Sequence, residues 1–160
     1  MQQVIVQKFG GTSVGSGERI AAVAEIIKKE AEINNVVIVV SAMAGETDRL
    51  IELSKQFGDN QNKREFDALI STGEKVSASL LAMALNSLGL KAKSYSAAQV
   101  SLKTTSNFSK AMILDIDKAK MEEILSDDSI PIITGFQGVT ESGEVTTLGR
   151  GGSDTTAVAI

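Results

Sequence analysis

The sequence predicts an α/β fold in which helices pack on both faces of a mostly parallel sheet. Three observations support this prediction. Apolar runs rich in β-branched residues alternate with amphipathic helical patterns along the chain. One run, Val36 to Val40, is apolar at every position, which is typical of a strand covered on both faces. The 160 residues, 42% of them hydrophobic, are enough for one globular domain with a buried core.

The amino-terminal part is expected to form a strand, a helix and a second strand. Val4 to Val6 is a short β-branched run that ends before Gly10-Gly11, which indicates a buried strand entering a glycine turn. An amphipathic helical pattern follows from Ile20 to Ala31 and ends at Asn34-Asn35. Because Val36 to Val40 is the next strand, this order predicts a right-handed parallel crossover.

The stretch from Arg64 to Leu88 is rich in Ala and Leu and is interrupted at Gly73. Its apolar residues recur near one helical stripe, so we expect one buried helix broken near Gly73, or two helices. The residues expected to form this buried stripe are Phe66, Leu69, Ile70, Val76, Leu80, Met83, Ala84 and Leu88.

Strands and a helix are expected to alternate after this stretch. The expected strands are residues 92–95, 113–116 and 130–134. Asp117 is a candidate cap for a helix that contains Met121, Ile124 and Leu125.

The carboxyl-terminal part is expected to hold a hairpin and the start of a helix. Ser142-Gly143 lies between two Val-Thr pairs, which predicts a glycine turn between two strands. Ser153 is expected to cap a helix that the sequence does not complete. We therefore expect residues 1–160 to be part of one domain that is truncated at its carboxyl end.

Composition excludes several classes of function. Sixteen Lys and Arg stand against twenty Asp and Glu, a net charge of −4 without the basic stripe that nucleic acids require. The chain has no cysteine, which excludes disulfides and thiolate metal sites, and no histidine, which excludes Ser-His-Asp catalysis. The amino terminus lacks signal-peptide features and Val36 to Val40 is too short to span a membrane, so we expect a cytoplasmic protein.

Two glycine-rich segments are candidate anion sites. Lys8 to Ser13 follows a strand, and its glycines would let backbone N–H groups approach a phosphate beside the Lys8 ammonium. It lacks the Walker pattern, and the alternative is an ordinary glycine turn with a solvated lysine. Gly149 to Asp154 opens a helix beside Arg150, which also favours an anion, although a capped helix with a surface arginine would look the same.

Other polar residues are candidates to complete a site. Glu74 lies in an apolar helical stretch, where a buried carboxylate would need a cationic partner such as an ammonium group. The alternative is that Glu74 lies on the solvated face of its helix. Ser41 and Thr47 follow the strand that ends at Val40, where open α/β sheets bind ligands, yet polar residues are common in such loops.

In combination, these segments resemble the aspartate kinase family in order and approximate spacing. The segments that carry the resemblance are Lys8 to Ser13, Ser41 to Thr47, Ser71 to Glu74 and Gly149 to Asp154. Val4 to Gln7 and Ile133 to Gly138 are also similar to that family, so the resemblance covers nearly the whole chain.

The resemblance implies an amino acid kinase fold, a three-layer α/β/α sandwich, in which MgATP phosphorylates L-aspartate to 4-phospho-L-aspartate. It implies that Lys8 is the main catalytic cation, that Asp154 orients it, and that Mg²⁺ is bound through the nucleotide phosphates. The residues implied to lie at the ATP phosphates are Lys8, Phe9, Gly10, Gly11, Thr12, Ser13 and Ser41. The residues implied to hold aspartate are Thr47, Glu74, Phe136, Arg150 and Ser153.

The family continues beyond the Gly-Arg-Gly-Gly-Ser-Asp motif into the rest of the kinase domain and small regulatory domains. We therefore expect residues 1–160 to be inactive alone, and we expect a homo-oligomer, a dimer or higher. The reaction is implied to be the first step toward lysine, threonine and methionine. The alternatives are an amino acid kinase that acts on glutamate, a carbamate or a nucleotide, and a non-catalytic ligand-binding fragment.

Overall fold

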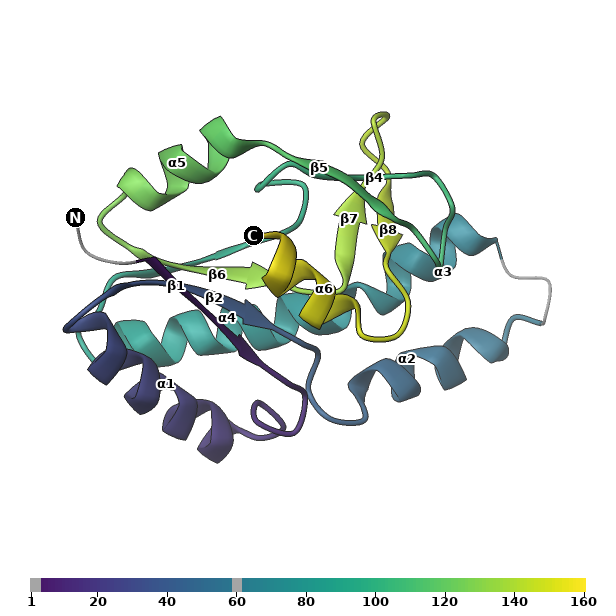
Figure 1. Cartoon of the computed structure of the whole chain (residues 1–160). Coiled ribbons are helices and arrows are strands. Elements are labelled where there is room, and N and C mark those ends of the chain that lie inside the picture. Colours follow the sequence, from purple (N-terminus) through teal and green to yellow (C-terminus); the bar gives the residue numbers. More distant parts are fainter. Residues whose placement is uncertain (1–3, 59–61) are drawn as a thin grey trace.

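The computed structural model describes residues 4–58 and 62–160, and its centre is a four-stranded parallel sheet (Figure 1). In spatial order the strands are β1 (Val4–Phe9), β2 (Asn35–Val40), β6 (Ile130–Thr134) and β3 (Ala92–Tyr95). Val6 pairs with Val37, and Ile38 with Ile132, in parallel register. The predicted strands at 92–95 and 130–134 are confirmed with their bounds, and the first strand continues to Phe9.

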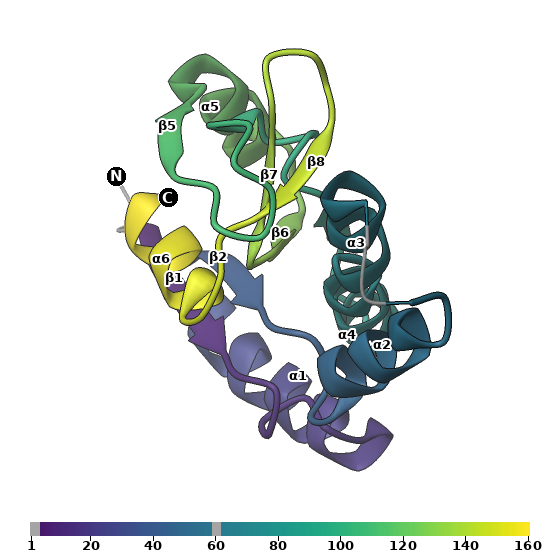
Figure 2. The ribbon, with the colours of Figure 1, turned by 90° about the vertical axis from the view of Figure 1, so that its right-hand side faces the viewer.

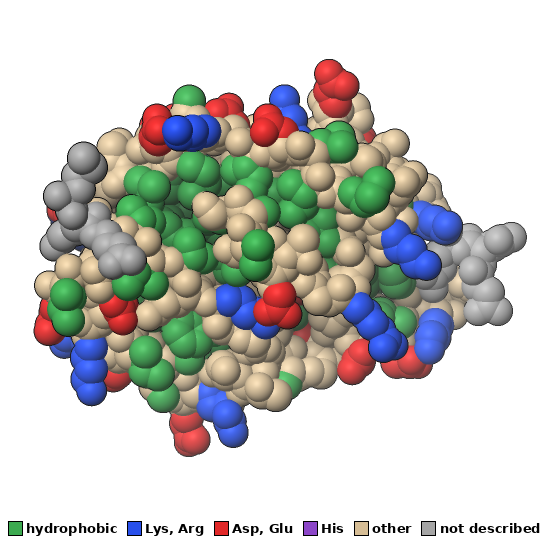
Figure 3. All heavy atoms as spheres, viewed as in Figure 1, with side chains coloured by type: hydrophobic (Ala, Val, Ile, Leu, Met, Phe, Trp, Pro, Cys, Tyr) green, Lys and Arg blue, Asp and Glu red, His purple; other side chains and the backbone are tan. Residues whose placement is uncertain are grey.

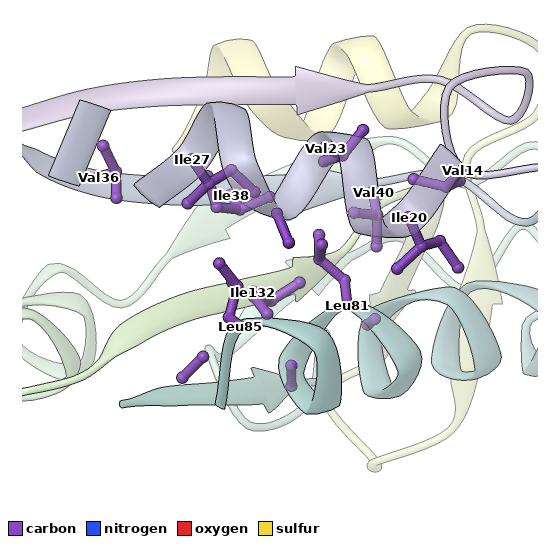
Figure 4. Close-up of a cluster of buried hydrophobic side chains, with 14 residues drawn as sticks. Val14, Ile20, Val23, Ile27, Val36, Ile38, Val40, Leu81, Leu85 and Ile132 are labelled. Atoms are coloured by element: carbon purple, nitrogen blue, oxygen red, sulfur yellow. The ribbon is translucent and has the colours of Figure 1, made fainter. Parts of the chain in front are cut away.

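One face of this sheet is covered by α1 (Gly17–Ala31) and α4 (Thr72–Ser87). Ile38 of β2 points toward Ile27 of α1 and Leu81 of α4, and all three side chains are fully buried (Figure 4). Full burial of side chains of this size stabilises the folded chain by roughly 1.5–3 kcal/mol each. The predicted strand, helix, strand unit is therefore confirmed, with β1 and β2 parallel.

The opposite face is covered by α5 (Lys118–Ser126) and α6 (Gly152–Ala159). Val39 of β2 belongs to a second buried cluster there, together with Met121 and Ile124 of α5. Successive β2 side chains therefore enter two different cores, which explains why every position of the run is apolar. Helices on both faces confirm the predicted three-layer α/β/α arrangement.

A second four-stranded sheet was only partly predicted. Its strands, in spatial order, are β5 (Ile113–Ile116), β4 (Leu102–Thr104), β7 (Gln137–Val139) and β8 (Val145–Thr147). The β7–β8 hairpin is confirmed, with Gly143 at φ 86° in its turn. The short strand β4, which pairs with both β5 and β7, has too few residues to show a pattern in the sequence.

The apolar stretch after residue 62 forms two helices, as one of the two predicted alternatives required. α3 (Lys63–Ile70) ends at Ser71, and α4 begins directly after it. The combined length Lys63–Ser87 is apolar enough to span a membrane, but half of its most apolar window is buried inside the protein. A core helix of a globular protein passes the same test.

The predicted buried stripe is wrong at three positions of α4, whereas Ile70 of α3 is buried and Ala84 and Leu88 pack half-buried against the core. Val76, Leu80 and Met83 are 44%, 38% and 66% exposed. The buried face instead carries smaller or polar residues, namely Gly73, Glu74, Ser77, Ala78, Leu81, Ala82 and Leu85. The buried positions recur at helical spacing from Asp67 through Ser71 and Glu74 to Leu85, and the small residues among them let α4 approach the sheet and α1 closely.

Helix ends account for two further differences from the predictions. α2 (Glu46–Lys55) was not predicted, because it is polar and buries only Leu50 against the protein. α6 is capped by Gly151 at φ 73°, so Ser153 is not the cap but a buried residue of the first turn. Asp117 does cap α5, since its carboxylate accepts a hydrogen bond from the N–H of Lys120 at 3.0 Å.

Hydrophobic side chains gather on the face of the molecule over α5, β5 and α6, with basic and acidic side chains interspersed around them (Figure 3). Met112, Leu114 and Val158 are 62%, 66% and 89% exposed. The charges on this face are mixed rather than arranged in a basic stripe.

Candidate functional site

The candidate site lies at the carboxyl ends of β1, β2 and β6, which Figure 2 views with α2, α4, α6 and the β7–β8 hairpin around them. Backbone hydrogen bonds join the loops that leave these strands. The N–H of Ser41 donates to the carbonyl of Phe9 at 3.1 Å, and the N–H of Gly135 donates to that of Val40 at 2.9 Å. Ligands commonly bind at this edge of an open α/β sheet.

Lys8 and Asp154 meet at this edge from opposite ends of the chain. The Nζ atom of Lys8 lies 2.8 Å from Oδ1 of Asp154, and their side chains are 26% and 69% exposed. A Cβ atom added at Gly10 would lie 3.4 Å from the same Nζ atom, so the ammonium lies over the glycine turn. The structure thus brings together the two glycine-rich segments that the sequence identified separately.

The turn after β1 offers backbone donors beside this ammonium. A Cβ atom at Gly11 would lie 2.7 Å from the carbonyl oxygen of Ala42, so only glycine fits at this close approach. Gly11 also accepts a hydrogen bond from the N–H of Ala44 at 3.0 Å. The N–H groups of Gly11 and Thr12 have no acceptor among residues 4–58 and 62–160. Free amides beside a lysine form an arrangement that can bind a phosphate.

Glu74 is buried, so the alternative that it lies on a solvated helix face is wrong. It is 3% exposed, and its Oε1 atom accepts a hydrogen bond from the N–H of Ala42 at 3.2 Å. Its Oε2 atom is buried and has no partner among the described residues. Burial raises the pKa of Glu74 to about 7, although backbone hydrogen bonds from Glu74 and Ala42 oppose the shift. A cation at Oε2 would favour the ionised carboxylate.

Gly73 explains how Glu74 reaches the strand edge. A Cβ atom at Gly73 would lie 2.8 Å from the Cβ atom of Ala42, so a larger residue would push α4 away from the loop after β2. The Oγ atom of Ser77 adds a hydrogen bond to the carbonyl of Ser41 at 2.7 Å. The start of α4 is therefore fixed against residues 41 and 42.

Arg150 projects from the turn that precedes α6. It is exposed, it lies between Gly149 and Gly151 at φ 80° and 73°, and it forms no salt bridge within the described part of the chain. Two glycines in the left-handed region make the turn tight. The guanidinium is thus available to a ligand carboxylate.

Phe136 and Ser153 fasten this turn to the end of β6. Phe136 lies at φ 69° and donates its N–H to the Oγ1 atom of Thr156 at 3.2 Å. A Cβ atom at Gly135 would lie 2.7 Å from the Oγ atom of Ser153. Left-handed backbone at a residue other than glycine is rare and costs energy, so the tight contact with α6 has to hold it in place.

Thr47 is the predicted residue that the structure joins least firmly to the others. It lies in the first turn of α2 and is half-buried. Within the described residues, no hydrogen bond links its side chain to Glu74 or to Arg150. Its neighbour Glu46 lies near Gly73, since a Cβ atom there would be 3.5 Å from the Glu46 Cγ atom.

The sequence prediction missed two buried polar residues behind the site. Asp67 of α3 is 0% exposed, and both of its carboxylate oxygens accept hydrogen bonds from Ser109 and Thr147. Gln137 is 1% exposed and donates its side-chain N–H to the carbonyl of Ser71. A carboxylate within an apolar helical run was the available signal for Asp67, as it was for Glu74.

The fold and this site define a class of protein. Residues 3–160 match the model of the amino acid kinase family, and the chain belongs to that family. Among its relatives, it is 54% identical over 158 residues to the aspartate kinase of Pseudomonas putida, covering 98% of this chain and 38% of that protein. The chain therefore spans less than half the length of this relative.

Solved structures show the same similarity. The aspartate kinase from Synechocystis superposes with a TM-score of 0.82 and 46% identity, over 98% of this chain and 26% of that one. Aspartokinase III of E. coli, solved in complex with aspartate and ADP, superposes with a TM-score of 0.78 and 25% identity, over 96% of this chain and 45% of that one.

Proposed function

We propose that this chain forms the amino-terminal, substrate-binding part of an aspartate kinase, which transfers the γ-phosphoryl group of ATP to the side-chain carboxylate of L-aspartate. The product is 4-phospho-L-aspartate, on the route to lysine, threonine and methionine. Relatives named aspartate kinase support the proposal, and one of them was solved with aspartate and ADP. The observation that carries it is the buried carboxylate of Glu74, whose Oε2 atom has no partner among the described residues.

Glu74 and Arg150 supply the charges that an amino acid requires. The free oxygen of Glu74 accepts the substrate ammonium group, and the fork of Arg150 binds a carboxylate through two parallel hydrogen bonds. Thr47, Ser153 and the backbone of Phe136 complete the contacts with aspartate. The site thus offers an anionic group to the ammonium of aspartate, and a cationic group and neutral donors to its carboxylates.

Lys8 and the glycine turn would hold the ATP phosphates. The fit is supported by the close approach of Gly11 to Ala42 and by the free N–H groups of Gly11 and Thr12. The phosphates would also lie beside Phe9, Gly10, Ser13 and Ser41. Asp154 orients the Lys8 ammonium through the 2.8 Å ion pair.

Catalysis by these residues is electrostatic and positional. The attacking carboxylate is already ionised at neutral pH, so no general base is required in a chain without histidine. Lys8 and the loop amides would offset the repulsion between the carboxylate and the phosphates. No group of three acidic residues that could hold a metal is present in the described part of the chain. We propose that Mg²⁺ is bound through the nucleotide phosphates.

The longer relatives imply further properties. Because this chain covers 38% of the Pseudomonas putida protein, we propose that residues 1–160 bind L-aspartate but do not complete the reaction alone. We also propose a homo-oligomer, a dimer or higher, in the cytoplasm.

A calorimetric titration of the folded chain with L-aspartate tests this proposal, with D-aspartate and L-glutamate as comparators. We expect L-aspartate to bind and the comparators to bind at least about tenfold more weakly, since a mispaired charge costs 1.4 kcal/mol or more. Glu74→Gln should abolish binding, whereas the matched control Glu122→Gln, on the exposed face of α5, should not change it. Equal binding by the two variants would exclude Glu74 from the site, and binding of L-glutamate alone would indicate another amino acid kinase.

A further inference from the structure

Buried Asp67 forms a polar cluster with buried Thr147 and half-buried Ser109. Its Oδ2 atom accepts hydrogen bonds from the N–H groups of Ser109 and Thr147, both at 2.8 Å. Its Oδ1 atom accepts from the hydroxyl groups of the same two residues, at 3.0 and 3.1 Å. Four donors therefore satisfy a carboxylate that is 0% exposed.

Both partners of Asp67 lead to the turn that carries Arg150. Thr147 is the last residue of β8, and the N–H of the next residue, Leu148, donates to the carbonyl of Phe136 at 2.9 Å. A Cβ atom at Gly149 would lie 3.5 Å from the carbonyl oxygen of Ser109. The turn before α6 therefore rests on both partners of Asp67.

The same pair of helices also carries Glu74. α3 holds Asp67, and α4 begins at Thr72 and presents Glu74 to the N–H of Ala42. Gln137 fastens the junction between the helices, because its side chain donates to the carbonyl of Ser71. Glu74 and the Arg150 turn are thus connected through α3, α4 and the hydrogen bonds of Asp67 and Gln137.

We propose that Asp67 is a positioning residue that fixes the Arg150 turn relative to Glu74. The inference rests on the proposed function, because it assigns to Glu74 and Arg150 the two charged groups of the amino acid. Asp67 itself does not touch the ligand. It acts through Thr147 and through the contact between Ser109 and Gly149.

A double-mutant cycle on L-aspartate affinity tests this inference. Asp67→Asn keeps the shape of the side chain but replaces an acceptor oxygen by an amide that cannot accept from two donors. We expect it to weaken L-aspartate binding about tenfold in the otherwise unchanged chain and less than about twofold in an Arg150→Ala background, because coupled residues are not additive. The control is Thr104→Val, which removes the buried 2.6 Å hydrogen bond to Thr146 in the same sheet without touching the Arg150 turn. It should change affinity less than about twofold.

A ligand-free measurement separates this inference from the proposed function. Backbone NMR of Asp67→Asn should shift the amide resonances of Gly149 to Gly152 and leave those of β1 and β2 in place. Ser109→Ala, which removes a single hydroxyl donor, should shift them in the same direction and serves if Asp67→Asn does not fold.

Each outcome has a definite meaning. If Arg150→Ala weakens binding and Asp67→Asn changes neither affinity nor the resonances, the positioning role is wrong while the aspartate site stands. Equal losses from Asp67→Asn in both backgrounds would also overturn it. If the unmodified chain binds no L-aspartate, the proposed function of this chain fails, and unshifted Gly149 to Gly152 resonances would still reject the positioning role.

Discussion

Two buried carboxylates on consecutive helices have opposite surroundings. Asp67 of α3 accepts four hydrogen bonds within the protein, from Ser109 and Thr147. Glu74 of α4 accepts one side-chain hydrogen bond, from the N–H of Ala42, and its second oxygen has no partner in the described structure. Burial of both is comparable, at 0% and 3% exposure. The fold itself therefore satisfies Asp67, whereas it leaves one oxygen of Glu74 free for the ligand proposed above.

The largest expected loss of stability follows from removing the carboxylate of Asp67. Asp67→Ala leaves two donors of buried Thr147 and two of half-buried Ser109 without an acceptor, so we expect the free energy of unfolding to fall by roughly 3–5 kcal/mol. Urea unfolding followed by circular dichroism measures this change. The control Asp115→Ala, at an exposed position of β5, should stay within about 0.5 kcal/mol. A comparably small change for Asp67→Ala would mean that its hydrogen bonds do not stabilise the native state.

Removing the charge of Glu74 should instead raise the free energy of unfolding. Its pKa is raised by burial from 4.5 to about 7, so the folded state binds a proton that the unfolded state releases. Stability contributed by this group is therefore complete below pH 4.5 and is lost as the pH rises through about 7. We expect Glu74→Gln to stabilise the chain by up to about 3 kcal/mol at pH 8 and to have little effect at pH 4.5. Urea unfolding at both pH values checks this, and destabilisation at pH 8 would mean that Glu74 is already compensated.

The affinity for L-aspartate should also depend on the protonation of Glu74. In the free chain Glu74 is mostly protonated at pH 6 and mostly ionised at pH 8, given its pKa of about 7. Because an ammonium group pairs with the ionised form, we expect L-aspartate to bind about tenfold more weakly at pH 6 than at pH 8. Calorimetry in two buffers of different ionisation enthalpy should also detect proton release at pH 6. An affinity that does not change between these pH values would exclude Glu74 as the ammonium acceptor.

The sequence predicted the parallel sheet better than the second sheet, for a physical reason. The run from Val36 to Val40 lies between two helical layers, so burial on both faces appears directly as an unbroken apolar pattern. β4 has three residues, Leu102–Thr104, and its pairing with β7 depends on contacts distant in sequence. Local patterns carry no signal for such pairing.

The residues of the candidate site were predicted from motifs, but the burial of their side chains was not. The sequence identified the residues Lys8, Glu74, Arg150 and Asp154 individually, and the structure adds the 2.8 Å ion pair that joins the first to the last. Whether Glu74 is buried could not be read from the large apolar residues, because the buried face of α4 also carries small residues such as Gly73 and Ser77. The predicted core positions Val76, Leu80 and Met83 lie outside this buried face and are exposed.

The smallest expected change in stability concerns the partly exposed ion pair, and it provides a contrast to both buried carboxylates. Lys8→Ala removes the partner of Asp154, whose side chain is 69% exposed, so solvent replaces most of the lost interaction. We expect the free energy of unfolding to change by less than about 1 kcal/mol, while affinity for MgATP or pyrophosphate falls about tenfold or more because Lys8 is the cation beside the free loop amides. Lys29→Ala, on the exposed side of α1, is the charge-matched control and should affect neither quantity. Unchanged phosphate affinity in Lys8→Ala would exclude Lys8 from the phosphate site. If the free energy of unfolding fell by several kcal/mol, the pair with Asp154 would serve to hold β1 and α6 together rather than to orient a cation for a ligand.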